Sequence, residues 1–130
     1  MSANLDLVRS IYADWERGDY SRTDWAHPEI EFVIADGPDP GSWRGLDGMA
    51  EAALGSVGAF DGYRAEAEHL REAHPGCVLA LVRGYGRPRG GTATAEDRGA
   101  GVFEIRAGKV TRLALYTDRG RALADLGLEH

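Results

Sequence analysis

Apolar side chains recur every three or four positions near the start of the chain, which predicts a helix over residues 5–17. The apolar face of this helix consists of Leu5, Val8, Ile11, Tyr12 and Trp15. Asn4 is placed to cap the helix and Gly18 to end it. A short helix is predicted over residues 22–26, and the β-formers of IEFVIA predict a strand over residues 30–35.

The second half of the chain has the pattern of a sheet. Four strand-like segments are separated by short turns, namely residues 63–73, 77–87, 92–107 and 109–118. A helix is predicted before them over residues 46–60, although Gly55 and Gly58 weaken it, since glycine costs ~1 kcal/mol relative to alanine inside a helix. A closing helix is predicted over residues 119–126. Consecutive strands with short turns give an antiparallel sheet, so we expect an α+β fold in which a curved sheet wraps around the N-terminal helices as a cone.

The segment between the first strand and the next helix, ADGPDPGSWRG (residues 35–45), is rich in turn-forming residues. Pro38 and Pro40 fix their own backbone angle and the glycines permit tight turns, so we expect a rigid connection. Trp43 in this segment is a candidate to close over a ligand at the rim of the cone.

Length and charge restrict the function classes. A chain of 130 residues is expected to form one domain, residues 1–130, of which residues 128–130 (LEH) are expected to be a cloning remnant. The formal net charge of −6 argues against nucleic acid as a partner. No apolar run approaches the ~20 residues of a membrane span, and the start lacks the features of a signal peptide, so a cytoplasmic protein is expected.

Four stretches of the sequence, taken in order, resemble the nuclear transport factor 2-like superfamily and, within it, the SnoaL-like proteins. They are VRSIYADWERGDY, HPEIEFVI, SWRGLDGMAE and VFEIRAGKVTRLALYTDRGRALADLGL. The resemblance implies a cone-shaped α+β barrel, usually dimeric, with a ligand pocket between sheet and helices. Polyketide cyclases, ketosteroid isomerases, limonene epoxide hydrolases and scytalone dehydratases share this fold with non-enzymes, so the fold alone does not decide the function.

The catalytic residues of ketosteroid isomerases do not carry over. The position that resembles their helical tyrosine holds Ile11, with Tyr12 adjacent. Their base falls near Val33, three residues before Asp36, and their protonated aspartate falls near Gly101. We therefore do not expect that mechanism, but Asp36 is kept as a candidate acid/base residue.

The aspartate of SnoaL-type cyclases falls on Leu115, which precedes Tyr116 and lies near Asp118. Tyr116 and Asp118 are therefore the other two candidate catalytic residues, although for Asp118 the cap of the final helix is the favoured interpretation. The epoxide hydrolases of this fold need two aspartates bridged by an arginine. Asp97, Arg98, Arg112 and Asp118 are available for these roles, but their spacing does not match. The run Glu96-Asp97-Arg98 is expected to be a bulge or turn with local ion pairing.

The candidate ligand-binding residues are aromatic side chains on elements expected to wrap the cone, together with one arginine that follows an apolar run. They are Tyr12, Trp15, Trp25, Phe32, Trp43, Phe60, Tyr63 and Arg83. Core packing and pocket lining are both open for the aromatic residues, and a surface position is open for Arg83. No two histidines have the spacing of metal ligands, so no metal is expected. Cys77 is the only cysteine and is expected to be a buried structural thiol.

Two functions follow from these observations. In the first, the chain is a dimeric protein that binds an apolar, cyclic small molecule and carries out cofactor-free acid/base chemistry, if it carries out any. In the second, it is a non-catalytic binding or interaction module that forms a homodimer through the outer face of its sheet.

Overall fold

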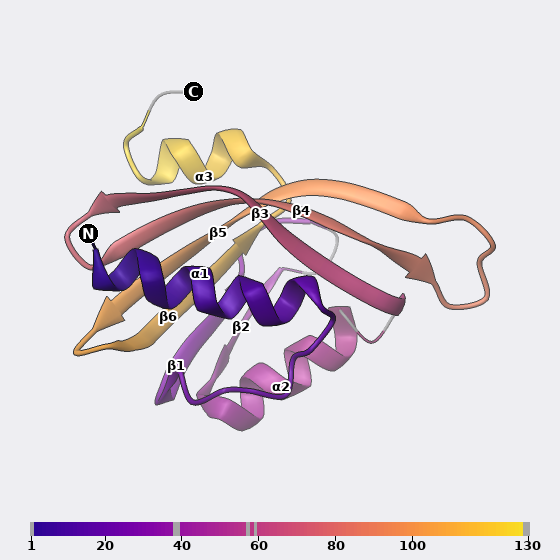
Figure 1. The fold of residues 1–130 in the computed structure, drawn as a ribbon, viewed down its shortest axis with the longest axis horizontal. Helices are drawn as coiled ribbons and strands as arrows, with labels where there is room; N and C mark the ends of the chain where they lie inside the picture. Colours follow the sequence, from indigo (N-terminus) through magenta and orange to yellow (C-terminus); the bar gives the residue numbers. More distant parts are fainter. Residues whose placement is uncertain (1, 38–39, 57, 59, 129–130) are drawn as a thin grey trace.

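The computed structural model describes residues 2–37, 40–56, 58 and 60–128. Its elements, in chain order, are α1 (Ala3–Glu16), β1 (Ala26–Ile34), β2 (Gly41–Arg44), α2 (Gly45–Ser56), β3 (Phe60–His74), β4 (Cys77–Pro88), β5 (Ala95–Arg106), β6 (Lys109–Tyr116) and α3 (Arg119–Asp125). Figure 1 shows their arrangement.

The strands form one curved, six-stranded sheet in the order β2-β1-β6-β5-β4-β3 (Figure 1). All neighbouring strands are antiparallel except β1 and β6, which run parallel. The sheet is open, with β2 and β3 at its edges. The predicted α+β fold with a curved, mainly antiparallel sheet is confirmed.

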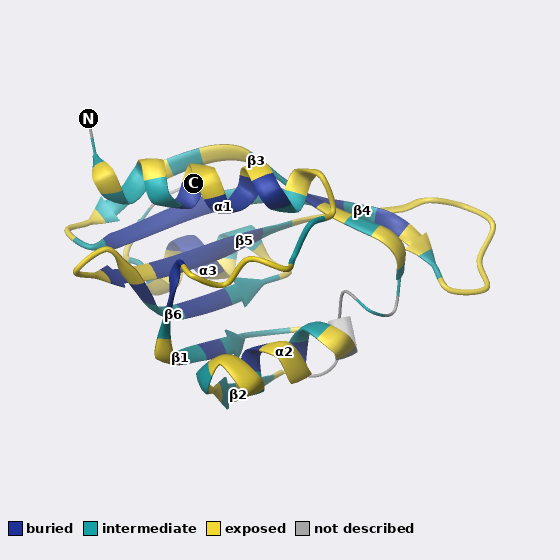
Figure 2. Ribbon diagram, turned by 60° about the horizontal axis from the view of Figure 1, so that its bottom comes forward, coloured by how far each residue is buried: buried dark blue, intermediate teal, exposed yellow. Residues whose placement is uncertain are grey.

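The helices cover both faces of the sheet. On the inner face, α1 packs against β3 and β4, and α2 packs against β1 and β2. The larger core lies there and includes Val8, Trp25, Ile30, Phe103 and Leu113. On the outer face, α3 packs against β5 and β6 over a second cluster of buried side chains. Figure 2 shows the buried residues concentrated along the strands between these helices.

Two local predictions near the N-terminus are wrong. Ser2 caps α1, because its hydroxyl accepts a hydrogen bond from the backbone N–H of Leu5, and Asn4 lies inside the helix. The helix predicted over residues 22–26 does not form. Ala26 instead begins β1 and pairs with Val110 of β6, so pairing with a distant strand overrides the local pattern.

The segment of residues 35–45 contains a strand that the sequence did not predict. Gly41–Arg44 forms β2, which pairs with the end of β1 and places Trp43 opposite Phe32. A Cβ atom at Gly41 would lie only 2.9 Å from Cη2 of Trp43, so the indole packs over a position that needs glycine. The predicted turn at Pro38 lies outside the described residues.

Candidate functional site

The three strands β3, β4 and β5 extend beyond the rest of the sheet and form a projecting arm (Figure 1). The last residue of β6 that pairs with β5 is Tyr116, which lies opposite Ala100. Residues 95–99 of β5 therefore pair only with β4. The candidate site lies on the inner side of this arm, where it joins the body of the fold.

Asp97 and Tyr63 meet over Gly84 on this inner side. Gly84 is paired with Asp97 across β4 and β5, and its N–H hydrogen-bonds to the Asp97 carboxylate. A Cβ atom at Gly84 would lie 2.6 Å from Oδ1 of Asp97 and would overlap the Tyr63 hydroxyl. The absence of a side chain at Gly84 is therefore what allows the carboxylate and the phenol to approach each other.

Asp97 carries a negative charge without a nearby cation. Its sequence neighbours face the other side of the pleated strand, where Glu96 binds Arg83 at 2.9 Å and lies 3.9 Å from Arg98. Within the described parts of the chain, no ion pair includes Asp97. Asp97 is an exposed residue, but its carboxyl is partly shielded from solvent, which raises its pKa; the Gly84 N–H opposes this, and the charge of Glu96 adds to it. The local ion pairing predicted for this run thus involves Glu96, and the run lies in β5 rather than in a turn.

Two more tyrosines lie beside Tyr63. The Tyr20 hydroxyl donates to the backbone carbonyl of Tyr63 at 3.0 Å. The Tyr12 hydroxyl lies 2.9 Å from where a Cβ atom of Gly101 would stand. Burial, followed by the charge of Asp97, raises the pKa of Tyr63 to about 12. Burial, followed by the proximity of Tyr63 and Tyr20, also raises the pKa of Tyr12, so these phenols stay protonated and can donate hydrogen bonds.

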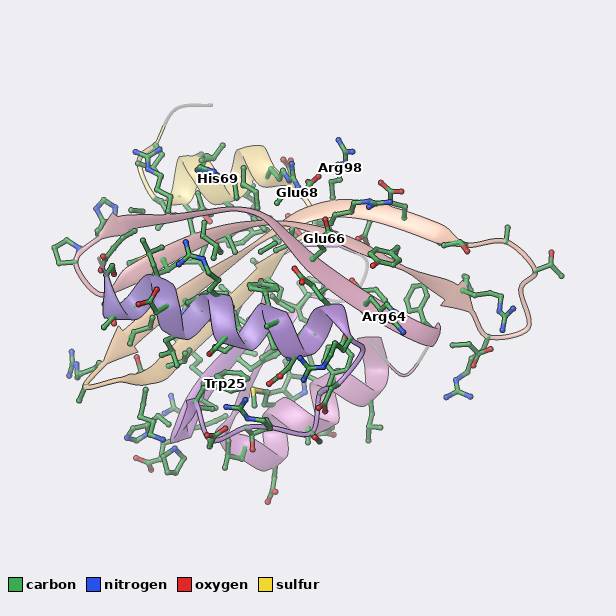
Figure 3. All side chains as sticks on the ribbon, in the orientation of Figure 1. Trp25, Arg64, Glu66, Glu68, His69 and Arg98 are labelled. Carbon is green, nitrogen blue, oxygen red and sulfur yellow. The ribbon has the colours of Figure 1, made fainter. Side chains whose placement is uncertain are left out.

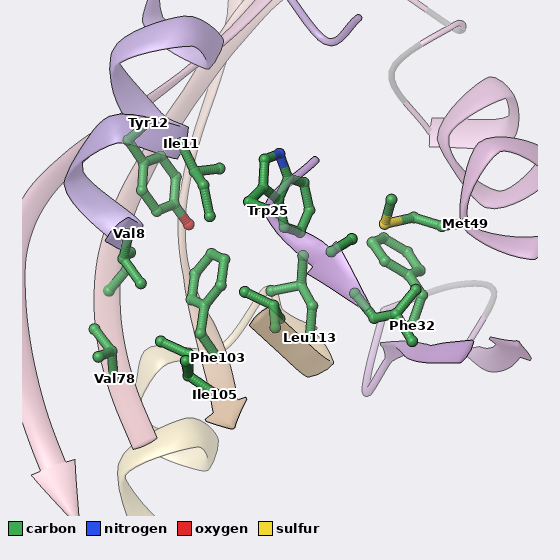
Figure 4. Close-up of a cluster of buried hydrophobic side chains, with 14 of the residues drawn as sticks. Val8, Ile11, Tyr12, Trp25, Phe32, Met49, Val78, Phe103, Ile105 and Leu113 are labelled. Atoms are coloured by element: carbon green, nitrogen blue, oxygen red, sulfur yellow. The ribbon is translucent and has the colours of Figure 1, made fainter. Parts of the chain in front are cut away.

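The Tyr12 hydroxyl has no hydrogen-bond partner among the described residues, although the residue is only 2 % exposed. No fully buried side-chain oxygen or nitrogen in those residues is unsatisfied, so the small exposed part of Tyr12 includes its hydroxyl. Figure 4 shows this hydroxyl at the inward end of the ring, on the side of Phe103. An oxygen atom of a ligand or a water molecule would satisfy this donor.

The three residues predicted as catalytic lie away from this cluster. Asp36 follows β1, and its carboxylate accepts hydrogen bonds from the N–H (2.6 Å) and hydroxyl (2.7 Å) of Thr117 and from the N–H of Asp118 (3.2 Å). Asp118 caps α3, as predicted: its carboxylate accepts hydrogen bonds from the backbone N–H groups of Gly120 and Arg121, which lack partners within the helix. Tyr116 lies on the outer face and donates to Asp125 at 2.9 Å.

The aromatic residues predicted to bind a ligand are mostly packed against one another. Trp15 lies 5.0 Å from Tyr12 and 5.9 Å from Trp25, both edge to face. Trp25 is 6 % exposed and lies among the buried side chains of Figure 4. At the other end of the interior, Phe32 and Trp43 form a similar pair at 6.3 Å. These contacts are those of a core.

The remaining predicted ligand-binding residues belong to the arm. Phe60 contacts Tyr63, with ring centroids 5.1 Å apart, on the inner side. Arg83 points to the outer side, where it binds Glu96 and covers the ring of Tyr85 at 5.1 Å. Of the predicted set, Tyr63 is therefore the residue whose polar atom meets Asp97, while the Tyr12 hydroxyl lies at Gly101, four residues further along β5 on the same face.

Sequence reasoning considered Asp97 only for the epoxide-hydrolase arrangement and did not select it as a site residue, although the sequence contains a signal for it. The segments RGYGR and DRGAG place glycines at alternate positions of two strands, namely Gly84 and Gly86 in β4 and Gly99 and Gly101 in β5. Alternate residues of a strand face the same side, so these glycines remove side chains from one face of the sheet. An aspartate within such a face has space around its carboxylate.

The surface of the molecule has two open grooves, one on each side of the sheet. One, of about 440 Å³, lies between α3 and the outer face and is lined by residues that include His74, Cys77 and Arg112. The other, of about 430 Å³, lies between α1 and β3 and includes Tyr12. Cys77 is buried and free, as expected. Among the residues that the structure describes, no group of three or more His, Cys, Asp or Glu side chains is arranged to hold a metal ion, and no helix is long and apolar enough to cross a membrane.

Comparisons with known proteins agree with the fold. Residues 8–113 match the family model of the SnoaL-like domain. An NTF2-like protein from Burkholderia thailandensis E264 is 26% identical, with a TM-score of 0.75 over 99% of this chain and 100% of that one. TerC, whose structure was determined with polyporic acid, is 22% identical, with a TM-score of 0.75 over 96% of this chain and 98% of that one. A proposed SnoaL-like polyketide cyclase from Jannaschia sp. CCS1 is 13% identical, with a TM-score of 0.72 over 98% and 94% of the two chains. No curated protein matches the chain.

Proposed function

We propose that this chain, which belongs to the family of SnoaL-like domain proteins, binds a small, largely apolar cyclic molecule on the inner face of its sheet and acts on it by cofactor-free acid/base chemistry. The observation that carries the proposal is the meeting of the Asp97 carboxylate and the Tyr63 hydroxyl over Gly84, with no cation beside Asp97 among the described residues. Carboxylates with a perturbed pKa in such a setting are frequent at functional sites.

Asp97 is the proposed proton acceptor and donor. Its pKa is raised by partial burial, which makes the carboxylate a stronger base than an ordinary exposed aspartate and brings it closer to the working pH. Tyr63 and Tyr12 remain protonated because their pKa values are also raised, so each can donate a hydrogen bond to a ligand oxygen. A carbonyl or hydroxyl oxygen on the ligand fits these donors.

The surroundings support an apolar ligand with few polar atoms. Leu115 and Ile34 pack on the inner face and are only partly buried. They occupy places near those where other enzymes of this fold carry carboxylates, so the inner face here is less charged. Isomerisation, cyclisation or hydrolysis of a carbonyl compound is consistent with this composition. Binding of polyporic acid by TerC and the proposed cyclase assignment of the Jannaschia protein support the same substrate class.

Asp36, Tyr116 and Asp118 stay predictions as acid/base residues. The carboxylates of Asp36 and Asp118 accept backbone hydrogen bonds at the β6–α3 junction, and Tyr116 is bonded to Asp125. Replacement of each by its uncharged or hydroxyl-free counterpart, tested in the same binding assay as Asp97, decides whether the residue contributes to ligand binding.

The second candidate is the non-catalytic dimeric module. The observation that favours it is that Gly101 and Leu115 stand where related enzymes carry carboxylates, so the inner face has lost those groups. The homodimer through the outer sheet face stays a prediction under both candidates.

The test combines native mass spectrometry with ligand titration. Freshly purified protein is measured under native and denaturing conditions, which gives the oligomeric state and the mass of any molecule carried through purification. Polyporic acid is then titrated while tryptophan fluorescence is recorded. We expect Asp97→Asn to weaken binding by about tenfold, equivalent to ~1.4 kcal/mol, since a hydrogen bond to a charged group contributes about that much.

The control is Glu96→Gln, which removes a carboxylate from the opposite side of the same strand. It is expected to bind within about twofold of the parent protein. Equal binding by Asp97→Asn and Glu96→Gln would exclude Asp97 from the ligand site. Absence of any ligand or binding, together with a dimer, would favour the interaction module.

A further inference from the structure

Arg119, the first residue of α3, connects three strands at the root of the arm. Its Nε donates to the carbonyl of Gly99 in β5 at 3.0 Å. Its Nη2 donates to the carbonyl of Val82 in β4 at 3.0 Å and to Oε1 of Glu68 in β3 at 2.5 Å. The Arg119 side chain is 26% exposed, so these bonds are partly shielded from solvent.

The position of this guanidinium follows from where β6 ends. Tyr116 is the last residue of β6 to pair with β5, and a Cβ atom at Gly99 would overlap the Tyr116 carbonyl. Beyond this point β5 has no neighbour on that side, and the Gly99 carbonyl receives its hydrogen bond from Arg119. The Arg119 side chain thus supplies a hydrogen bond to β5 just beyond the point where the backbone of β6 stops pairing with it.

Glu68 reaches Arg119 because β3 has an irregularity there. Its register with β4 shifts between Ala67 and His69, and Glu68 lies at that shift. Figure 3 shows Glu68 near the beginning of α3. The hydrogen bond from Arg119 is the main cause of the lowered pKa of the Glu68 carboxyl, so this pair is charged at neutral pH.

The proposed site lies one step further out on the same two strands. On β5, Asp97 lies two residues further toward the tip of the arm than Gly99, which Arg119 contacts. On β4, Gly84 lies two residues further toward the tip than Val82, the other strand residue that Arg119 contacts. Tyr63, whose hydroxyl lies over Gly84, belongs to the strand that carries Glu68. Every strand that contributes to the Asp97–Tyr63 pair is therefore bound by the same guanidinium.

We propose that Arg119 is a positioning residue that fixes the arm at its root and thereby holds Asp97 and Tyr63 in place over Gly84. The importance of this position rests on the function proposed above, but the mechanical role does not. A planar guanidinium with several fixed donors can bond to two carbonyls and a carboxylate at once, whereas the compact ammonium of lysine cannot span the same three groups. The role of Arg119 thus depends on the geometry of its donors and not on its charge alone.

The test measures the arm and the Asp97 carboxyl without any ligand. Arg119→Lys and Arg119→Ala are compared with Arg121→Ala, which removes a charge from the same helix. The side chain of Arg121 forms no hydrogen bond or ion pair with the described part of the arm. Hydrogen exchange is followed for residues 83–98 relative to β1, and the Asp97 carboxyl is titrated by carbon-13 NMR. In both Arg119 variants we expect exchange in the arm to be about tenfold faster and the pKa of Asp97 to move toward the ordinary value of about 3.9.

Arg121→Ala is expected to leave both measurements unchanged. If the Arg119 variants also leave arm exchange and the pKa of Asp97 at parental values, the positioning role is wrong, whatever happens to α3. Should Arg119→Ala fail to fold, Glu68→Gln weakens the same contact while leaving the carbonyl bonds, and it must shift both measurements in the same direction. The proposed function fails separately, through unchanged ligand affinity in Asp97→Asn.

Discussion

The hydroxyls of Tyr12 and Tyr20 provide a matched pair for testing whether one of them is reserved for a ligand. Both rings pack against Trp15, Tyr12 edge to face at 5.0 Å and Tyr20 stacked at 5.9 Å. The Tyr20 hydroxyl donates to the carbonyl of Tyr63, whereas the Tyr12 hydroxyl has no partner among the residues described. Replacement of either residue by phenylalanine removes the hydroxyl and keeps the ring.

The two replacements are expected to change stability in different ways. Tyr20→Phe loses one hydrogen bond between neutral groups, which contributes ~1 kcal/mol to the free energy of unfolding. Tyr12→Phe loses no intramolecular bond and removes a hydroxyl that is largely withdrawn from water, so it should leave stability unchanged or raise it by up to ~1 kcal/mol. The two variants should therefore differ by about 1–2 kcal/mol, with Tyr12→Phe the more stable.

Urea unfolding followed by tryptophan fluorescence measures this difference. With a urea dependence of ~2 kcal/mol/M, the midpoints of the two variants should be separated by about 0.5–1 M. Tyr12→Phe should at the same time weaken the binding of polyporic acid, because it removes a proposed donor. A Tyr12→Phe variant that is destabilised as much as Tyr20→Phe would refute the reasoning, since the Tyr12 hydroxyl would then have a partner within the folded chain.

Four further outcomes are expected. Partial shielding from solvent raises the pKa of Asp97 in the folded state, so ionisation of Asp97 lowers the free energy of unfolding as the pH rises through that pKa. Asp97→Asn should therefore be at least as stable as the parent at pH 7 and lose this advantage below about pH 4. Parallel stability profiles of the two proteins against pH would contradict this. Burial acts to raise the pKa of Asp36, but its three hydrogen bonds lower it overall. The contribution of Asp36 to the free energy of unfolding is therefore present above its pKa in the unfolded chain and is lost as the pH falls through its pKa in the folded chain. The difference in stability between the parent and Asp36→Asn should shrink in acid, whereas a constant difference would argue against the hydrogen bonds of Asp36. Gly84→Ala should destabilise the protein by about 1–3 kcal/mol through overlap with Tyr63, measured as a lower urea midpoint, and an unchanged midpoint would mean that the phenol does not lie there. Asp118→Ala should cost ~1 kcal/mol of unfolding free energy by loss of the α3 cap, without altering polyporic acid binding if the residue acts only as a cap.

The amino-acid sequence by itself determined the elements whose signals are local. The three- and four-residue spacing of Val8, Ile11 and Tyr12 specifies α1, because a helix brings these positions to one face whatever it packs against. Asp118 specifies the start of α3 in the same way, since its carboxylate bonds to N–H groups only two and three residues away. The turns at Gly76 and Gly108 are equally local, because both residues adopt a positive φ.

Only the tertiary structure decided the elements and contacts that depend on distant partners. The strand Gly41–Arg44 exists because β1 is available for pairing, and residues 22–26 are not helical because Ala26 pairs with β6. Asp36 bonds to Thr117, which lies far along the chain at the end of a neighbouring strand. No periodicity within a short segment contains the identity of such a partner.

The candidate site belongs to this second class. In the sequence, Asp97 stands between Glu96 and Arg98 and resembles one member of a charged surface run. The pleat of β5 turns it to the opposite side, and the pairing of β5 with β4 brings it over Gly84 and beside Tyr63. Its environment is thus set by side chains on two other strands and by one missing side chain. The alternation within the strand turns Asp97 away from Glu96 and Arg98, while the register between strands decides which residues it meets there.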